Sequence, residues 1–307
     1  MKMAEAQRQL LSIVIVSYNV RELLEACLRS LPMGGVEEPE VWVVDNASTD
    51  GSVEMVRHLF PTVNLIVNQD NAGFPKGNNQ AIRRCSGKFI LLLNPDTVVK
   101  QDAFKILISY LEDHPEAGLV GPKLLNADGS HQYSVMPFLR PLEIILETFF
   151  LHGWYRSKRD HRMQGDQAPR PVDALSGAAI LLRREVFDRI GLLDEQLFWT
   201  EDMEFCLRAH QARIGVAYMP EAEIVHHSGA SGKKNQRVMV SNQVLSKIRY
   251  FSRNHPALVF WTCWFFRLLH IISRLLILLP LSIFALRYRE KLDAYAFTLK
   301  RFIRGDY

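Results

Sequence analysis

The chain has 307 residues, of which 48% are hydrophobic and 23% charged, with a formal net charge of +4. This composition is that of a globular protein and excludes a disordered chain. Lysine and arginine gather at residues 156–162 and 287–304 without forming one continuous stripe, so we expect no nucleic-acid partner. The four cysteines form no CxxC pair, which favours a reducing compartment over a disulfide framework or a zinc knuckle.

Short apolar strands alternate with amphipathic helices along the first 120 residues, after a polar tail (1–10) without the pattern of a secretion signal. The predicted strands cover 11–16, 41–44, 63–67 and 89–93. The predicted helices cover 23–31, 53–60, 78–85 and 104–111. This alternation predicts an α/β fold, Rossmann-like, with a mainly parallel sheet sandwiched by helices.

The second half of the chain is less regular. Strands are predicted near Leu119 and at 178–182 and 215–218, with a helix that begins at Thr200-Glu201-Asp202. Between them, residues 136–174 contain four prolines and one helical patch at 142–151, and we expect a mobile loop there.

Polar clusters follow each of the first four predicted strands. They are Ser17-Tyr18-Asn19, Asp45 to Asp50, Asn68 to Asn78, and Asn94-Pro95-Asp96. In a doubly wound sheet these strand ends lie along one edge, where ligands bind. The sequence therefore predicts a site for a polar ligand. No GxGxxG or GxxxxGK[ST] motif is present, so a dinucleotide site or a phosphate loop is not expected.

Carboxylates dominate these clusters and indicate the ligand. Asp45 suits acceptance of a hydrogen bond from a base or ribose, whereas Asp96 beside an anion requires a divalent cation between them. A metal-bound nucleoside diphosphate fits both. Lys76 and the backbone at Gly73 and Gly77 could supply donors to phosphates, although Lys76 is more simply explained as a solvated loop lysine.

Two further segments carry chemistry. Trp199 stands close to Glu201 and Asp202, and an aromatic platform beside carboxylates suits a sugar whose hydroxyl is to be deprotonated. The alternative is that both acids only stabilise the start of a helix. His226-His227 ends the last strand, and a mixed Asp and His ligand set favours Mn²⁺ over Mg²⁺.

The ordered motifs resemble those of family 2 glycosyltransferases of the GT-A fold, especially the rhamnosyltransferase-like branch of bacterial cell-surface polysaccharide assembly. They are VSYN, VDNASTDGS, NAGFPKGNNQ, LLLNPDT, SGAAILLRREVFDRIGLLDE, FWTEDMEFCLR and HHSG, and they span Leu11 to Gly232. The resemblance implies an inverting sugar transfer, with Asp45 on the nucleoside, a metal-binding DxD-type motif at 94–96, and Asp202 as catalytic base. Asn94 stands where the first Asp of that motif is expected, so one carboxylate is lost.

The complete site prediction combines the strand ends with this resemblance. The nucleotide-sugar is expected to contact Ser17, Tyr18, Asn19, Asp45, Asn46, Lys76, Asn78, Asn94, Asp96, Gly177 and Ala178. The acceptor is expected at Trp199 and Glu201, and a divalent metal, Mg²⁺ or Mn²⁺, at Asp96 and His227. Gly177 and Ala178 are included because small residues let the backbone approach a sugar closely.

Residues 256–286 are strongly apolar and are interrupted only by Arg267, His270 and Arg274, which fall on one helical face. Because arginine is costly inside a bilayer, we expect an amphipathic helix in the membrane interface, with the basic residues of 287–304 on anionic headgroups. A core-packed helical pair or a dimer surface remains the alternative. The predicted organisation is then a tail (1–10), a GT-A domain (11–232, with a nucleotide-binding half 11–121 and an acceptor-binding half 122–232) and a membrane-associated helical region (233–307).

The expected partners are a nucleotide-sugar donor, a glycan or polyprenyl-linked acceptor, and a membrane surface at residues 256–307, with a homodimer left open. The expected location is the cytoplasmic face of the inner membrane, as a peripheral protein. Two other functions stay open: an inactive nucleotide-sugar-binding membrane partner of a polysaccharide assembly complex, for which Asn94 is the support, and a sugar nucleotidyltransferase.

Overall fold

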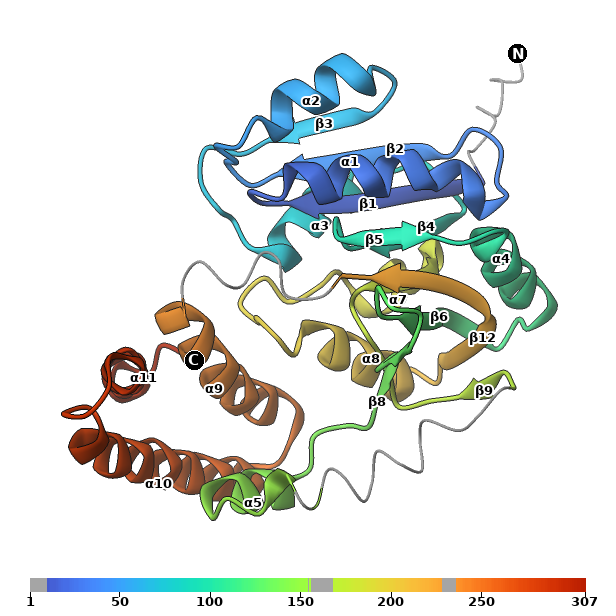
Figure 1. The fold of residues 1–307 in the computed structure, drawn as a ribbon. Coiled ribbons are helices and arrows are strands. Elements are labelled where there is room, and N and C mark those ends of the chain that lie inside the picture. Colours follow the sequence, from blue (N-terminus) through green and yellow to red (C-terminus); the bar gives the residue numbers. More distant parts are fainter. Residues whose placement is uncertain (1–9, 154, 156–167, 228–235) are drawn as a thin grey trace. The chain divides into compact units, whose positions relative to one another are not determined.

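The computed structural model describes residues 10–153, 155, 168–227 and 236–307 (Figure 1). The chain forms two compact units. Unit 1 comprises 1–137, 166–196 and 201–231, and unit 2 comprises 138–165, 197–200 and 232–307. The predicted division into a GT-A domain (11–232) and a helical region (233–307) stays a prediction. The segments 138–165 and 197–200, however, belong to the C-terminal unit.

Unit 1 is built on one large mixed sheet with the strand order β3-β2-β1-β4-β11-β6-β12-β5 (Figure 1). The strands are β1 (Leu11–Ser17), β2 (Glu40–Asp45), β3 (Asn64–Val67), β4 (Phe89–Leu93), β5 (Thr97–Val99), β6 (Ala117–Leu125), β11 (Ala179–Arg183) and β12 (Gly215–His226). The first four are mutually parallel, which confirms the predicted βαβ units. In contrast, β11 is antiparallel to β4, because the chain enters β11 beside the end of β4 and runs back along it.

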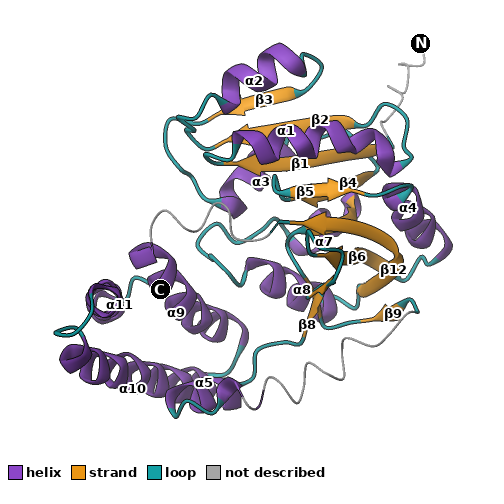
Figure 2. Cartoon of the chain, in the orientation of Figure 1, coloured by secondary structure: helices purple, strands orange, loops and turns teal. Residues whose placement is uncertain are grey.

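Helices cover this sheet on both faces (Figure 2). They are α1 (Arg21–Ser30), α2 (Ser52–Leu59), α3 (Phe74–Ile82), α4 (Ala103–Asp113), α7 (Arg184–Ile190) and α8 (Glu201–Gln211). Leu24 of α1 and Phe104 of α4 are fully buried in one core with Leu91 of β4. Each such side chain contributes roughly 1.5–3 kcal/mol of transfer free energy. On α3, Gly77 permits close contact with β1, since a Cβ there would lie 2.8 Å from a methyl of Val16.

The stretch 136–174 is more regular than the loop predicted for it. It contributes to β8 (Val135–Met136) and β10 (Ala174–Leu175), which pair with each other, and contains β9 (Arg170–Pro171), which pairs with β12. The expected helical patch is α5 (Pro141–Thr148). A strand of two residues is too short to show an alternation of apolar and polar residues, so the sequence does not predict it. Residues 154 and 156–167 of this stretch lie outside the described residues.

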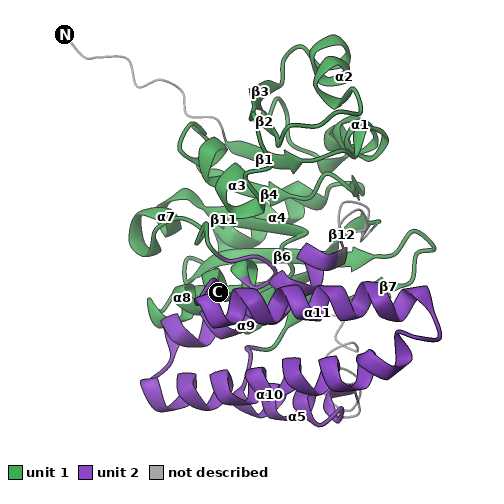
Figure 3. Ribbon diagram, turned by 90° about the vertical axis from the view of Figure 1, so that its left-hand side faces the viewer, with its two compact units in different colours: residues 1–137, 166–196, 201–231 green, residues 138–165, 197–200, 232–307 purple. Residues whose placement is uncertain are grey.

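In its described residues, unit 2 contains α5 and three longer helices, α9 (Gln236–Asn254), α10 (Ala257–Leu281) and α11 (Leu286–Arg304) (Figure 3). Within this unit α10 packs against each of the other three. Of the helices in the described residues, α10 alone has the length and apolar composition that would allow a membrane crossing. This confirms the strongly apolar C-terminal helix that the sequence predicts.

Candidate active site

The polar ends of the first strands lie side by side, as the parallel sheet predicts. Ser17, the last residue of β1, pairs in register with Asp45, the last residue of β2, and Asp45 pairs with Val67 of β3. The backbone N–H of Asn46 continues this edge by donating to the carbonyl of Ser17 over 2.9 Å. Two of the predicted donor-site residues, Ser17 and Asp45, are therefore neighbours.

Asp45 is buried and only half satisfied. Its Oδ1 accepts a hydrogen bond from the backbone N–H of Ser48 over 2.8 Å, whereas Oδ2 has no protein partner among the described residues. The hydroxyl of Ser17, also buried, lacks a partner in the same part of the chain. An unsatisfied buried acceptor costs roughly 1–3 kcal/mol. A ligand that brings a donor to Asp45 recovers this free energy.

Asparagine side chains hold the loops around Asp45. The side-chain oxygen of Asn19 accepts from the N–H of Thr49 over 2.8 Å, and the backbone N–H of Asn19 donates to the hydroxyl of Ser48 over 2.9 Å. The Nδ2 of Asn68 donates to Oδ1 of Asn46 over 2.8 Å. Asn19 and Asn46 thus already use their side chains to shape the site. The adjacent Tyr18 is half-buried.

Helix α3 brings one further unsatisfied group. Asn78 is fully buried, and its Nδ2 donates to the carbonyl of Phe74 over 2.9 Å while its Oδ1 has no partner within the described chain. Lys76 is exposed, so the structure is compatible with both of its sequence-based explanations. Asn79, which sequence reasoning missed, exchanges hydrogen bonds with the backbone of Leu193 and fixes α3 to the segment before α8.

The corner after β4 places Asp96 beside a histidine. Asp96 is 5% exposed, and its Oδ1 lies 3.3 Å from Nε2 of His226. Nδ2 of Asn94 lies 3.4 Å from the same nitrogen, and Nδ1 of His226 lies 2.6 Å from Oε1 of Gln132. His227 instead exposes its side chain and donates its backbone N–H to the carbonyl of Asp96 over 2.8 Å. The imidazole that faces Asp96 is that of His226, because consecutive residues of a strand point to opposite sides.

Asp202 lies at the start of α8 and is connected to this corner through the backbone of 177–178. The N–H of Asn94 donates to the carbonyl of Ala178 over 2.9 Å, and the N–H of Gly177 donates to Oδ2 of Asp202 over 2.9 Å. The second oxygen of Asp202 accepts from the N–H of Met203 over 2.7 Å. Burial raises the pKa of Asp202 from 3.8 to about 6, since these hydrogen bonds offset only part of the desolvation. A carboxylate with this pKa is suited to accept a proton near neutral pH.

Residues 12–191, more than half of the chain, match the protein-family model described as Glycosyl transferase family 2. The chain belongs to this family. It is a glycosyltransferase, as the motif resemblance implies, and the sheet edge and the 94–96 corner lie within the matched span.

Two curated relatives show the similarity. An N-acetylglucosaminyl-diphospho-decaprenol L-rhamnosyltransferase of Mycobacterium tuberculosis is 29% identical over 238 residues, which cover 72% of this glycosyltransferase and 77% of the relative. The low-salt glycan biosynthesis hexosyltransferase Agl10 of Haloferax volcanii is 25% identical over 253 residues, 77% of each chain.

Two solved structures share the fold. The mannosyltransferase PcManGT of Pyrobaculum calidifontis, in complex with GDP-Man and Mn²⁺, superposes with a TM-score of 0.54 at 16% identity, covering 97% of this glycosyltransferase and 87% of that chain. GalNAc-T7 with UDP, GalNAc and Mn²⁺ gives a TM-score of 0.58 at 16% identity, over 81% of this chain and 48% of the other. The likeness confirms the predicted GT-A fold.

A divalent cation can be tested against the residues at the corner. Within the described residues no three His, Cys, Asp or Glu side chains are arranged to hold a metal ion. The pair formed by Asp96 and His226 nevertheless supplies an oxygen and an imidazole nitrogen, which together suit Mn²⁺. The donor set fits a cation whose remaining ligands come from a diphosphate. The metal role expected for His227 stays a prediction.

The residues predicted for the acceptor lie next to Asp202 in sequence. Glu201 is the first residue of α8 and is half-buried. Trp199 belongs to unit 2, is exposed, and has a φ of +84°, which is unusual for an aromatic residue. Glu204, by contrast, is buried and pairs with Arg208 through both carboxylate oxygens, as a structural residue of the helix does. The acceptor roles of Trp199 and Glu201 stay predictions.

Proposed function

We propose that this glycosyltransferase moves a sugar, with rhamnose the first to test, from a nucleoside diphosphate to a lipid-linked glycan acceptor in bacterial cell-surface polysaccharide synthesis. The observation that carries the proposal is the connection of Asp202 to the 94–96 corner through Gly177 and Ala178. It links a carboxylate of raised pKa to the residues expected at the diphosphate. The rhamnosyl and lipid-diphosphate substrates in the name of the mycobacterial relative support the choice of substrates.

The donor lies along the sheet edge in this proposal. Oδ2 of Asp45 accepts a hydrogen bond from the base or ribose, and Ser17 and Asn78 offer two more buried oxygens without partners in the described chain. Tyr18, Asn19 and Asn46 border the same place, and Lys76 approaches the phosphates. These unsatisfied groups support a polar ligand that contains several donors.

The transfer requires a base on the acceptor side. Asp202 accepts the proton of an acceptor hydroxyl as that oxygen bonds to the anomeric carbon. The bond between this carbon and the diphosphate oxygen breaks, and its electron pair leaves with the nucleoside diphosphate. Attack opposite the leaving group inverts the anomeric configuration. The N–H groups of Gly177 and Met203 hold the carboxylate in one orientation throughout.

Asp96 and His226 would hold a divalent cation, Mn²⁺ or Mg²⁺, next to the diphosphate, and His227 is the alternative ligand from the sequence. When bound, the cation neutralises charge on the departing diphosphate. Asn94 contributes an amide in place of a second carboxylate. The backbone holds this corner in place, because the N–H of His227 donates to the carbonyl of Asp96.

The location that suits a lipid-linked acceptor is the cytoplasmic face of the inner membrane, with the chain as a peripheral protein. The apolar helix α10 supports this location. Unit 2 supplies the membrane contact in this proposal, and unit 1 the chemistry.

The test is a transfer assay with purified chain, Mn²⁺ and a panel of nucleotide sugars, including dTDP-rhamnose, with a polyprenyl diphosphate-linked N-acetylglucosamine acceptor. We expect the wild type to release nucleoside diphosphate with one of the nucleotide sugars. In Asp202→Asn the rate of this release should fall at least a thousandfold while donor binding persists. Donor binding without turnover by the wild type would favour the inactive partner. Formation of a nucleotide sugar from a nucleoside triphosphate would favour the nucleotidyltransferase.

A further inference from the structure

Helix α10 exposes its apolar side and buries its charged side. Exposed apolar residues recur every three or four positions along one side of the helix, which we call the outer stripe: Leu258, Trp261, Phe265, Leu269, Ile272, Leu276 and Leu279. Arg267 follows Phe265 by two residues, about 200° around the helix, and is 1% exposed. A surface helix of a water-soluble protein has the opposite arrangement, with its apolar side buried and its charged side exposed.

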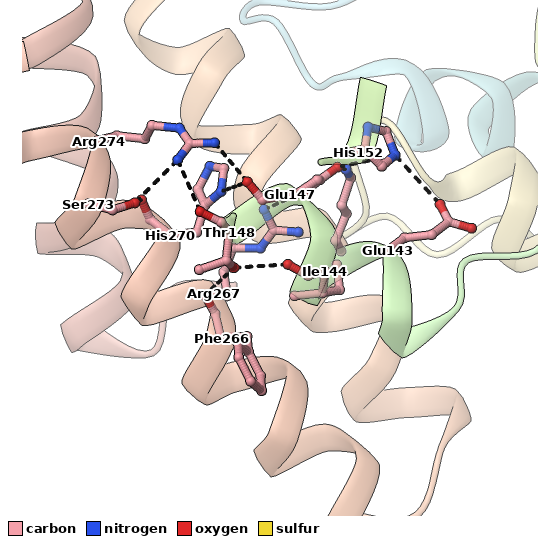
Figure 4. Close-up of polar contacts among 11 residues, drawn as sticks. Glu143, Ile144, Glu147, Thr148, His152, Phe266, Arg267, His270, Ser273 and Arg274 are labelled. Atoms are coloured by element: carbon pink, nitrogen blue, oxygen red, sulfur yellow. Dashed lines mark hydrogen bonds and ion pairs between the residues drawn. The ribbon is translucent and has the colours of Figure 1, made fainter. Parts of the chain in front are cut away.

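The charged side of α10 is neutralised inside unit 2 (Figure 4). Nη1 of Arg267 lies 2.8 Å from Oε2 of Glu147 on α5, and Lys247 of α9 pairs with the other oxygen of the same carboxylate. Nη2 of Arg274 donates to the carbonyl of Glu147 over 2.7 Å, which satisfies the end of α5. Arg267 and Lys247 hold the pKa of Glu147 at about 2 against the opposing effect of burial. The polar groups expected to face water or headgroups are therefore turned inward.

The other helices of unit 2 restrict how α10 can meet a bilayer. Helix α5 covers the charged side, and α9 and α11 pack against α10 as well. Helix α11 carries eight charged residues in 19, and charged side chains are costly at the bilayer centre. If α10 crossed the membrane alone, it would have to leave Glu147 and expose Arg267 to hydrocarbon. While unit 2 stays folded, the outer stripe is the side of α10 that remains exposed and can meet lipid.

The outer stripe continues into apolar and then basic residues. After α10, the turn 282–285 exposes Ile283 by 73% and Phe284 by 81%. The first turns of α11 then expose Arg287, Arg289 and Lys291. Such cations are attracted to an anionic membrane surface. A second copy of the chain would carry the same positive charge, whereas anionic headgroups complement it.

We infer that the outer stripe and the turn 282–285 dock on an anionic phospholipid bilayer with α10 parallel to the membrane plane, held from behind by the ion pair of Glu147 and Arg267. This inference rests on the membrane location proposed above and specifies its surface and geometry. It differs from the sequence-based expectation in one respect. Arg267 and His270 pack inside the protein and do not face water or headgroups.

Flotation of the full chain with vesicles tests the surface. Vesicles of phosphatidylglycerol and phosphatidylethanolamine are compared with vesicles of phosphatidylcholine. We expect the wild type to float with the anionic vesicles, and Phe265→Ser/Leu276→Ser to lose at least tenfold in bound fraction. The control Met33→Ser/Leu59→Ser removes two exposed apolar side chains of unit 1 and should float like the wild type. Equal flotation of the stripe variant and the wild type overturns the inference.

Binding of a nucleoside diphosphate, measured by calorimetry on the same variants, separates this inference from the proposed function. Lost flotation with intact nucleotide binding supports the docking surface. If the wild type binds nucleotide and transfers sugar but does not float with the vesicles, the docking inference is wrong and the proposed function stands. If, without lipid, the stripe variant converts a dimer to a monomer in sedimentation, the surface joins two copies and the inference is wrong.

The orientation has its own measurement. A fluorophore is attached to a cysteine introduced at Leu258, Leu269 or Leu279, and its depth is measured by quenching from lipids labelled at known positions. Docking in the plane places all three labels at one shallow depth, about 5–10 Å into the boundary between headgroups and acyl chains. A crossing helix would separate positions 258 and 279 by about 31 Å along the membrane normal, and this result would refute the in-plane geometry.

Discussion

Gly177 donates its backbone N–H to Oδ2 of Asp202 over 2.9 Å, and a Cβ at position 177 would lie 3.3 Å from the same oxygen. The contact leaves no room for a side chain without moving the carboxylate by a few tenths of an ångström. We therefore expect Gly177→Ala to lower kcat about tenfold, since an error of 1 Å costs roughly a hundredfold in rate. Nucleoside diphosphate affinity should change less than twofold. Gly153→Ala is the control, because a Cβ there meets nothing within 4 Å. Equal kcat values for the two variants would contradict the positioning role of Gly177.

The raised pKa of Asp202 predicts an acidic limit to catalysis. The carboxyl must be ionised to accept a proton, and its pKa is about 6. As the pH falls below this value the protonated fraction grows, and kcat should drop about tenfold per pH unit. Above it, kcat should level off. The measurement is kcat at saturating donor between pH 5 and 8, with donor binding followed over the same range as a control for unfolding. A kcat that stays constant from pH 8 down to pH 5 would mean that Asp202 is not the base.

We expect Asp45 to contribute to the binding of a nucleoside diphosphate mainly through its Oδ2. Asp45→Asn keeps an oxygen for the N–H of Ser48 but replaces the unpartnered oxygen with an amide donor. A hydrogen bond to a charged group is worth about 1.5–3 kcal/mol, so the Kd of a nucleoside diphosphate should rise roughly 10- to 100-fold. Asp70→Asn makes the same chemical change at an exposed position and should leave the Kd unchanged. Calorimetry on both variants decides whether the edge of β2 binds the nucleoside.

The sheet edge could be predicted from the sequence because parallel strands place their C-terminal ends together. Ser17 and Asp45 follow β-branched runs, and their adjacency is a consequence of parallel pairing. The supporting pairs could not be found in the same way. Asn79 meets Leu193, 114 positions later, and no local pattern encodes a contact between residues so far apart in the chain.

The two histidines show a second limit of sequence reasoning. Alternation along a regular strand would decide which of His226 and His227 faces Asp96, but the register of β12 against β6 shifts between Met219 and Glu223. Such an irregularity reverses which residues point to a given face. Likewise, the sequence predicts that Arg267 lies on one face of an apolar helix. It does not predict the ion pair with Glu147, because that residue belongs to a helix far away in the chain.

Metal dependence should separate the two histidines. Since Nε2 of His226 lies 3.3 Å from Asp96 and the side chain of His227 is exposed, His226→Gln should raise the Mn²⁺ concentration for half-maximal activity about tenfold. His227→Gln should change it less than twofold. The measurement is Mn²⁺ titration of chelator-treated enzyme. The opposite ranking would restore His227 as the ligand. Full activity of the wild type in excess chelator would refute a metal requirement.

Glu147 should stabilise unit 2 far more than a surface carboxylate stabilises its helix. Glu147→Gln leaves Arg267 buried without an opposite charge, which typically costs about 3–5 kcal/mol of unfolding free energy. Glu25→Gln removes the exposed pair with Arg29 and should cost about 0–1 kcal/mol. Urea unfolding of the full chain followed by far-ultraviolet circular dichroism, which reports the helices of both units, measures both.

The pH dependence gives the same prediction an independent check. The pKa of Glu147 falls from 4.5 to about 2 on folding, so its ionised form stabilises the folded chain. That contribution is complete above pH 4.5 and is lost as the pH falls toward 2. The difference between wild type and Glu147→Gln should therefore be largest at neutral pH and shrink in acid. A difference that is independent of pH would mean that the variant acts through packing and not through the lost charge.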